Sequence, residues 1–98
     1  AYYEHMIERH VCDDRFIAMA RAMGAEGDVQ PCNFLTKLCA LIKECGADNL
    51  KMSDYGIRPE DFPSLAENAM SSMKRVFLND RVPLTKEDVI AIYSKSYK

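Results

Sequence analysis

The sequence predicts an all-α protein, a compact bundle of five to six helices in one small domain. Apolar residues recur at the helical spacing i, i+3, i+4, i+7, and no segment shows the sustained alternation of a half-buried strand. Glycines, prolines and capping residues separate the helical segments. The length of 98 residues, with 48% hydrophobic and 29% charged residues, is typical of one globular domain.

Composition argues against two classes of partner. The net charge is -2 and the pI is near 5.6, whereas nucleic acids and anionic membranes favour a basic surface. No apolar run approaches the about 20 residues that span a bilayer. We therefore expect no nucleic-acid partner and no membrane partner.

The first helix is expected from residue 1 to residue 7. Its apolar face would consist of Tyr3, Met6, Ile7 and His10. The segment has neither an initial Met nor a capping residue, which suggests a piece of a longer protein. A trimmed chain or a disordered leader is the alternative.

The second helix is expected from Asp13 to Met23, with Cys12 or Asp13 at the N-cap and Gly24 as the stop. The acidic pair after Cys12 suits the positive end of the helix dipole. Its apolar face would consist of Phe16, Met19, Ala20 and Met23. A polar turn follows, in which Asp28 could cap the next helix.

The segment from Pro31 to Cys45 is the most apolar in the chain and predicts the third helix. Pro31 suits the first helical position, and Gly46 can adopt the left-handed conformation that ends a helix. Apolar residues cover more than one stripe of this helix. A helix of this kind is normally central, so we expect the other helices to pack around it.

Three shorter features follow the third helix. A single helical turn is expected over Lys51–Tyr55, closed by Gly56, and another opens at Pro59. Phe62 precedes a proline and is biased away from helix. One continuous helix is then expected from residue 64 to residue 77, followed by a loop over residues 79–83.

The last helix has the clearest start signal. Thr85 and Asp88 have the spacing of a capping box, in which each side chain accepts a hydrogen bond from the other residue's backbone N–H. Leu84 could pack against Val89 as a hydrophobic staple. Val89, Ile92 and Tyr93 would then face the core.

The four cysteines and two histidines do not form a recognisable site. The cysteine spacings match neither a zinc motif nor a favourable disulfide within a helix, so we interpret them as free thiols in a reducing cytoplasm. His5 and His10 are five residues apart, which turns them to different sides of a helix. No Gly-rich phosphate loop and no catalytic motif is present.

Four segments, in this order, resemble the iron-containing (group III) alcohol dehydrogenases. Residues 15–24 resemble the family's R-F-x-x-I-A-x-x-M-G helix, and residues 50–57 its L-x-x-x-G-I turn, with Asp54-Tyr55-Gly56 most similar to the butanol-dehydrogenase branch. Residues 60–69 resemble E-D-I-P-x-L-A-x-x-A, and residues 84–93 resemble L-T-x-E-D-I-x-x-I-Y.

The resemblance implies a two-domain parent enzyme. An N-terminal α/β domain would bind NAD or NADP, and a helical domain of the dehydroquinate-synthase-like type would hold iron or zinc through one Asp and three His. Residues 1–98 resemble only the C-terminal portion of that helical domain, and none of them matches a metal-binding, cofactor-binding or catalytic residue. We therefore expect no metal or cofactor on this chain alone. The partners would be the rest of the parent chain, a small alcohol or aldehyde and, in a homodimer, a second parent chain.

The resemblance also implies a place for the substrate. Val76, Phe77 and Asn79 match the family's substrate-side loop before the closing helix and are expected at the rim of the substrate cleft. Packing of Phe77 between the last two helices is the alternative. The family's loop often reads Asn-Pro-Arg, whereas this chain has Asn79-Asp80-Arg81. A different function is a stand-alone helical interaction domain with a methionine-rich face.

Overall fold

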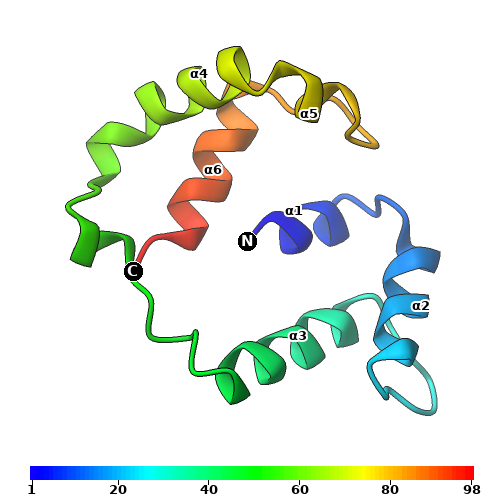
Figure 1. Cartoon of the computed structure of the whole chain (residues 1–98). Helices are drawn as coiled ribbons and strands as arrows, with labels where there is room; N and C mark the ends of the chain where they lie inside the picture. Colours follow the sequence, from blue (N-terminus) through cyan, green and yellow to red (C-terminus); the bar gives the residue numbers. More distant parts are fainter. The chain divides into compact units, whose positions relative to one another are not determined.

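A computed structural model describes all 98 residues and contains only helices (Figure 1). The elements are α1 (Tyr2–Glu8), α2 (Asp13–Ala22), α3 (Cys32–Glu44), the 3-10 helices η1 (Met52–Tyr55) and η2 (Pro59–Asp61), α4 (Phe62–Ser72), α5 (Lys74–Leu78) and α6 (Lys86–Ser96). The predicted all-α class is thereby confirmed. None of these helices has the length and apolar character needed to cross a membrane.

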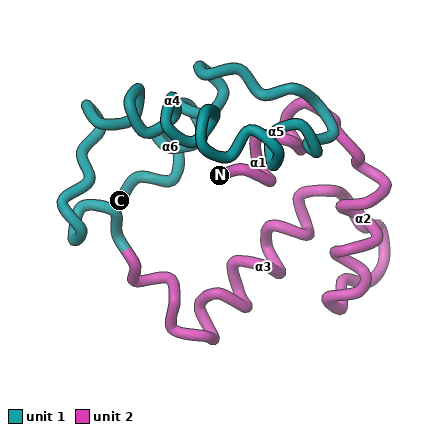
Figure 2. Tube along the Cα trace, turned by 45° about the horizontal axis from the view of Figure 1, so that its top comes forward, with its two compact units in different colours: residues 1, 51–98 teal, residues 2–50 magenta.

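The chain forms two compact units, which Figure 2 distinguishes by colour. Unit 2 contains residues 2–50, with α1, α2 and α3. Unit 1 contains residues 1 and 51–98, with the remaining helices.

An aromatic cluster joins the three helices of unit 2. Tyr3 of α1 lies with its ring centroid 6.0 Å from that of Phe16 of α2 and 5.2 Å from that of Phe34 of α3. The Phe16 and Phe34 rings are 5.6 Å apart, and both side chains are buried. Aromatic pairs at such separations add to the free energy gained by burial alone.

The turn between α1 and α2 contains His10, which was expected on the apolar face of the first helix. His10 has a φ of 54° and Cys12 a φ of 60°, so both residues are left-handed and His10 lies outside α1. The expectation that His10 extends the face of the first helix is therefore wrong. The His10 Nδ1 atom lies 2.9 Å from Asp13 Oδ2, a hydrogen bond across the turn.

The start of α3 also corrects an expectation. The Gln30 backbone N–H donates to Asn33 Oδ1 at 2.7 Å, whereas Asp28 Oδ1 accepts a hydrogen bond from the Gln30 side chain at 3.2 Å. Asp28 therefore does not cap the helix. Asn33 satisfies a free donor before the first turn, as a side chain three residues ahead does in a capping box.

The prediction that α3 is a central helix is wrong for its C-terminal half. Phe34 is its only buried residue, and every residue from Leu41 to Leu50 is exposed. Leu41 is 46% exposed and Ile42 38% exposed. The reason is that unit 2 has only α1 and α2 to pack against α3.

Unit 1 begins with the two expected turns. Gly56 ends η1 with a φ of 74°, and the Arg58 backbone N–H donates to Asp61 Oδ2 at 2.9 Å at the start of η2. Phe62, however, is α-helical, with φ -58° and ψ -40°. Its ring is buried 5.9 Å from that of Tyr93 and 5.7 Å from that of Tyr97, and this packing outweighs the bias before proline.

The helix expected from residue 64 to residue 77 is interrupted at Met73, which has φ -113° and ψ 30°. Two serines precede the interruption. The Ser71 hydroxyl donates to the Asn68 carbonyl at 3.1 Å, and the Ser72 hydroxyl donates to Asn68 Oδ1 at 3.0 Å. Serine hydroxyls compete with the backbone for hydrogen bonds and are frequent at helix bends.

The capping box of α6 is confirmed. The Asp88 N–H donates to Thr85 Oγ1 at 3.1 Å, and the Thr85 N–H donates to Asp88 Oδ2 at 2.9 Å. Val89 is buried, and α6 packs against α4. At the other end, the Ser53 N–H donates to the Lys98 carbonyl at 3.1 Å, so η1 lies next to the last residue.

Candidate functional site

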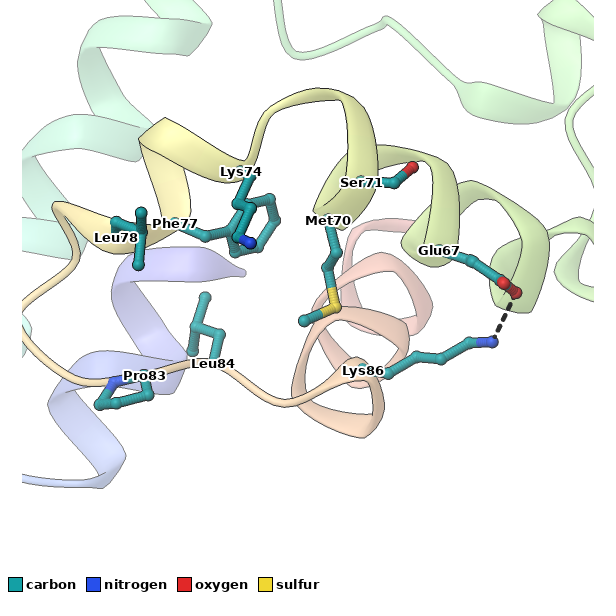
Figure 3. Close-up of a pocket in the computed structure, with 9 residues that line it drawn as sticks. All are labelled: Glu67, Met70, Ser71, Lys74, Phe77, Leu78, Pro83, Leu84 and Lys86. Carbon is teal, nitrogen blue, oxygen red and sulfur yellow. Dashed lines mark hydrogen bonds and ion pairs between the residues drawn. The ribbon is translucent and has the colours of Figure 1, made fainter.

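Unit 1 contains an open groove of about 650 Å³, formed by α4, α5 and the segment that leads into α6 (Figure 3). The lining residues are Glu67, Met70, Ser71, Lys74, Phe77, Leu78, Pro83, Leu84 and Lys86. All of them belong to unit 1, so the groove is a feature of one compact unit. We call it the α5 groove.

Two local features of the sequence shape the α5 groove. The interruption at Met73 starts a new helix, α5, on which both Phe77 and Leu78 line the groove. The capping box at Thr85 fixes the start of α6, and Leu84 and Lys86 flank that residue. The groove therefore depends on a helix break and on a helix start.

The floor of the α5 groove is mostly apolar. Met70 of α4, Phe77 of α5 and Leu84 surround its central part in Figure 3. Phe77 is half-buried, whereas Leu78 and Pro83 at the margin are exposed. An apolar floor with few polar groups is the usual lining of a small-molecule site.

The groove is lined by two charged side chains that form an ion pair and by one that does not. Lys86 Nζ lies 3.0 Å from Glu67 Oε2, so these two charges offset each other. Lys74 has no ion-pair partner in the chain. The lining therefore carries one uncompensated positive charge, on a chain whose net charge is -2.

The three residues expected at a substrate rim lie in different places. Phe77 lines the α5 groove. Val76 is 59% exposed and lines a second open hollow of about 500 Å³ instead. The Asn79 side-chain Nδ2 donates to the Arg75 carbonyl at 3.0 Å at the end of α5. The structure brings only Phe77 to the groove, and the substrate role of all three residues stays a prediction.

Sequence reasoning missed Met70 and Lys74 as groove residues. Met70 lies on the helical stripe of α4 and gives no signal beyond packing. Lys74 could be found only by knowing that the helix is interrupted at Met73, because that break sets the direction of α5. The groove is a consequence of the break rather than of a motif.

The histidines and cysteines do not provide a metal site. No group of three or more His, Cys, Asp or Glu side chains is placed so that it could hold a metal ion. His5 is half-buried on α1, and His10 is exposed in the following turn. All four cysteines are free thiols. The donor set of this chain therefore does not fit iron or zinc, which require several converging ligands.

The methionines do not gather on one element. Met6, Met19 and Met23 belong to unit 2, and Met52, Met70 and Met73 to unit 1. Met6 is buried, whereas Met19 and Met73 are exposed. Met19 and Met23 both belong to α2 and its C-terminal end, and Met70 and Met73 to α4 and its C-terminal end, so a methionine-rich docking face stays a prediction.

The sequence matches, over residues 2–97, the model of a family described as the Fe-containing alcohol dehydrogenase family, C-terminal. No curated protein and no solved structure gives a significant match.

Proposed function

Because the chain belongs to the Fe-containing alcohol dehydrogenase family, over its C-terminal region, we propose that it is the C-terminal helical segment of an NAD(P)-dependent, iron-containing alcohol dehydrogenase. The parent enzyme interconverts alcohols and aldehydes or ketones by hydride transfer between the alcohol carbon and the nicotinamide. The match over nearly the whole chain is the single observation that carries this proposal.

Within the proposed enzyme, iron or zinc and the nicotinamide are held by residues outside this chain. The donor set of this chain does not fit a metal ion, and its sequence has no Gly-rich phosphate loop for the nicotinamide cofactor. We therefore assign no catalytic step to residues 1–98. Their proposed contribution is packing and one wall of the substrate cleft.

The α5 groove supports the proposed wall. Phe77 matches the family's substrate-side loop and lies half-buried in a groove of about 650 Å³ with an apolar floor. Small alcohols and aldehydes have apolar bodies that such a floor can cover. We propose Phe77 as the principal rim residue, with Val76 and Asn79 beside it on the same short helix and its end.

The proposal also covers the branch, the compartment and the partners of the parent. Asp54-Tyr55-Gly56 favours a butanol-dehydrogenase-like member. Four free thiols are typical of a reducing compartment, which supports a cytoplasmic enzyme. The proposed partners are the rest of the parent chain, a small alcohol or aldehyde and a second parent chain in a homodimer, without nucleic acid or membrane.

The coding sequence upstream of Ala1 tests the proposal first. We expect it to encode a nucleotide-binding α/β domain followed by one Asp and three His in the metal-binding motifs. The protein expressed with that region should reduce NAD+ or NADP+ in the presence of an alcohol and Fe2+. A matched truncation that ends at residue 50 should lose this activity, because it lacks the proposed cleft wall.

Two results would contradict the proposal. One is an upstream sequence without a nucleotide-binding domain, which would favour the helical interaction domain. The other is a truncated enzyme that keeps its kcat/KM for alcohols. The first result concerns the family activity and the second only the role of this segment.

A further inference from the structure

We infer that the α5 groove binds a small organic anion, with an apolar body on the groove floor and one carboxylate at Lys74. The inference concerns a property of unit 1 by itself and does not require the parent enzyme to be active. Together with the proposed function, on which this extension rests, the inference also names the substrate class of the parent enzyme. The substrate would be an alcohol or aldehyde that also carries a carboxylate.

The apolar half of the inference follows from the floor. Met70, Phe77 and Leu84 come from α4, from α5 and from the segment before α6, and they line one continuous groove (Figure 3). The apolar surface of a short alkyl chain would leave water on entering it. Each methylene that is buried in this way strengthens binding by up to about fourfold. An alkyl chain therefore supplies the affinity.

The anionic half follows from the charges. Lys86 Nζ and Glu67 Oε2 lie 3.0 Å apart and form an ion pair, so neither group needs a charged ligand as a partner. Lys74 is the remaining charged group of the lining and has no partner in the chain. Lys74, Phe77 and Leu84 all line the groove (Figure 3). An ammonium group in this place favours one carboxylate next to the apolar floor.

Nuclear magnetic resonance titration of the 15N-labelled 98-residue chain tests the inference with three probes at the same salt concentration. Hexanoate has the alkyl chain and the carboxylate, hexan-1-ol has only the chain, and acetate has only the charge. We expect hexanoate to shift the amide signals of α5 and of residues 83–86 and to bind about two- to fivefold more tightly than hexanol, the ratio of an exposed ion pair. Acetate should bind more weakly than either.

Variants separate the ammonium of Lys74 from net charge. Lys74→Met should bring the Kd of hexanoate to that of hexanol and leave the Kd of hexanol unchanged. Arg75→Met, which removes the same charge from the next residue, should keep the preference because Arg75 lines only the second hollow. Phe77→Ala should weaken hexanoate and hexanol alike. Amide spectra of the free variants check that each one is folded.

Several outcomes would overturn the inference. Equal affinity for hexanoate and hexanol would show that the carboxylate contributes nothing to binding. Amide signals that shift only in other parts of the chain would show that the α5 groove is not the binding site. The absence of any saturable shift up to the solubility of hexanol would show the same. Equal effects of Lys74→Met and Arg75→Met would show general attraction by net charge. Activity of the parent on simple alcohols would not alter any of these results, so the two proposals fail separately.

Discussion

At the scale of the residue, the aromatic cluster of Tyr3, Phe16 and Phe34 is the best-defined packing in unit 2. The three ring centroids are 5.2 to 6.0 Å apart, so each ring contacts the other two. Because the three rings come from three helices, each ring links its own helix to the other two helices of unit 2. Phe16, on α2, is buried, whereas Tyr3 is partly exposed.

Replacement of Phe16 tests this cluster. We expect Phe16→Ala to lower the free energy of unfolding of unit 2 by about 3 kcal/mol or more, because it removes a buried ring and leaves a cavity. Phe16→Leu should cost less, about 1.5 kcal/mol, since it keeps most of the volume. Amide hydrogen exchange in residues 2–50 measures both effects. Leu41→Ala, at an exposed site, is the control and should change the protection of amides from exchange little. An equal loss of protection in Phe16→Ala and Leu41→Ala would refute the role of the cluster.

Phe77 is the residue at which function is most directly tested. In the intact parent, we expect Phe77→Ala to change the ratio of kcat/KM for short and longer alcohols by about tenfold or more, since one methylene in an apolar pocket is worth about 1–3 kcal/mol. Leu41→Ala is the control, because Leu41 is an exposed apolar residue of unit 2 and does not line the groove. The metal content should stay the same in both variants.

The alternative for Phe77 predicts a different pattern. If Phe77 serves only to pack unit 1, Phe77→Ala should lower kcat/KM equally for every alcohol and should also lower the Tm. That result would remove Phe77 from the substrate rim.

At the scale of the element, the starts and ends of helices decide the shape of unit 1. Thr85 and Asp88 exchange two hydrogen bonds at the start of α6. These bonds satisfy backbone donors that have no partner within the helix. They also hold Leu84 and Lys86, which flank Thr85, at the α5 groove.

Loss of this cap should be measurable. We expect Thr85→Ala to lower the free energy of unfolding by about 1 kcal/mol, the usual cost of removing a threonine cap. Thr36→Ala is the matched control, because Thr36 lies inside α3, where alanine has the higher helix propensity. Denaturant unfolding followed by circular dichroism compares the two variants. An equal midpoint for Thr85→Ala and the unchanged chain would show that the cap contributes nothing.

The elements that could be predicted are those with local causes. The capping box at Thr85 and the stops at Gly24 and Gly56 depend on residues close in sequence, and the structure confirms them. The break at Met73 and the helical Phe62 depend on competition between local preference and packing, which periodicity does not reveal. Val29 is buried although it stands alone in a polar turn, so no pattern marked it.

The candidate site was less predictable than the fold. Phe77 was identified through resemblance to a family loop, but Lys74 and Met70 were not. They meet at the groove because α5 departs from α4 at Met73. The exposure of Leu41 and Ile42 was missed for a related reason: an apolar stripe predicts that a face can be buried, and not that a partner within the same chain covers it.

At the scale of the whole molecule, the chain has the composition of a globular protein but lacks a converging donor set. His5 and His10 lie on different elements, and the cysteines are free thiols. In the proposed parent, metal chemistry and substrate contact therefore come from different stretches of sequence.

This separation predicts that the 98-residue chain holds no stoichiometric iron or zinc. After incubation with either metal and dialysis, elemental analysis should find well below one ion per chain. A double variant, His5→Ala with His10→Ala, should retain the same small amount. A stoichiometric ion that disappears in this variant would show that the histidines are ligands and that the metal motifs had been misplaced.

The hydrogen bond between the Ser53 amide and the Lys98 carbonyl brings the two ends of residues 51–98 together. A segment with adjacent ends can be inserted into a surface loop of another protein, since the host chain also leaves and returns at neighbouring points. Residues 51–98 are therefore suited to transplantation as a cassette. Such a graft would carry the α5 groove, complete with its floor and its lysine, into a host of choice.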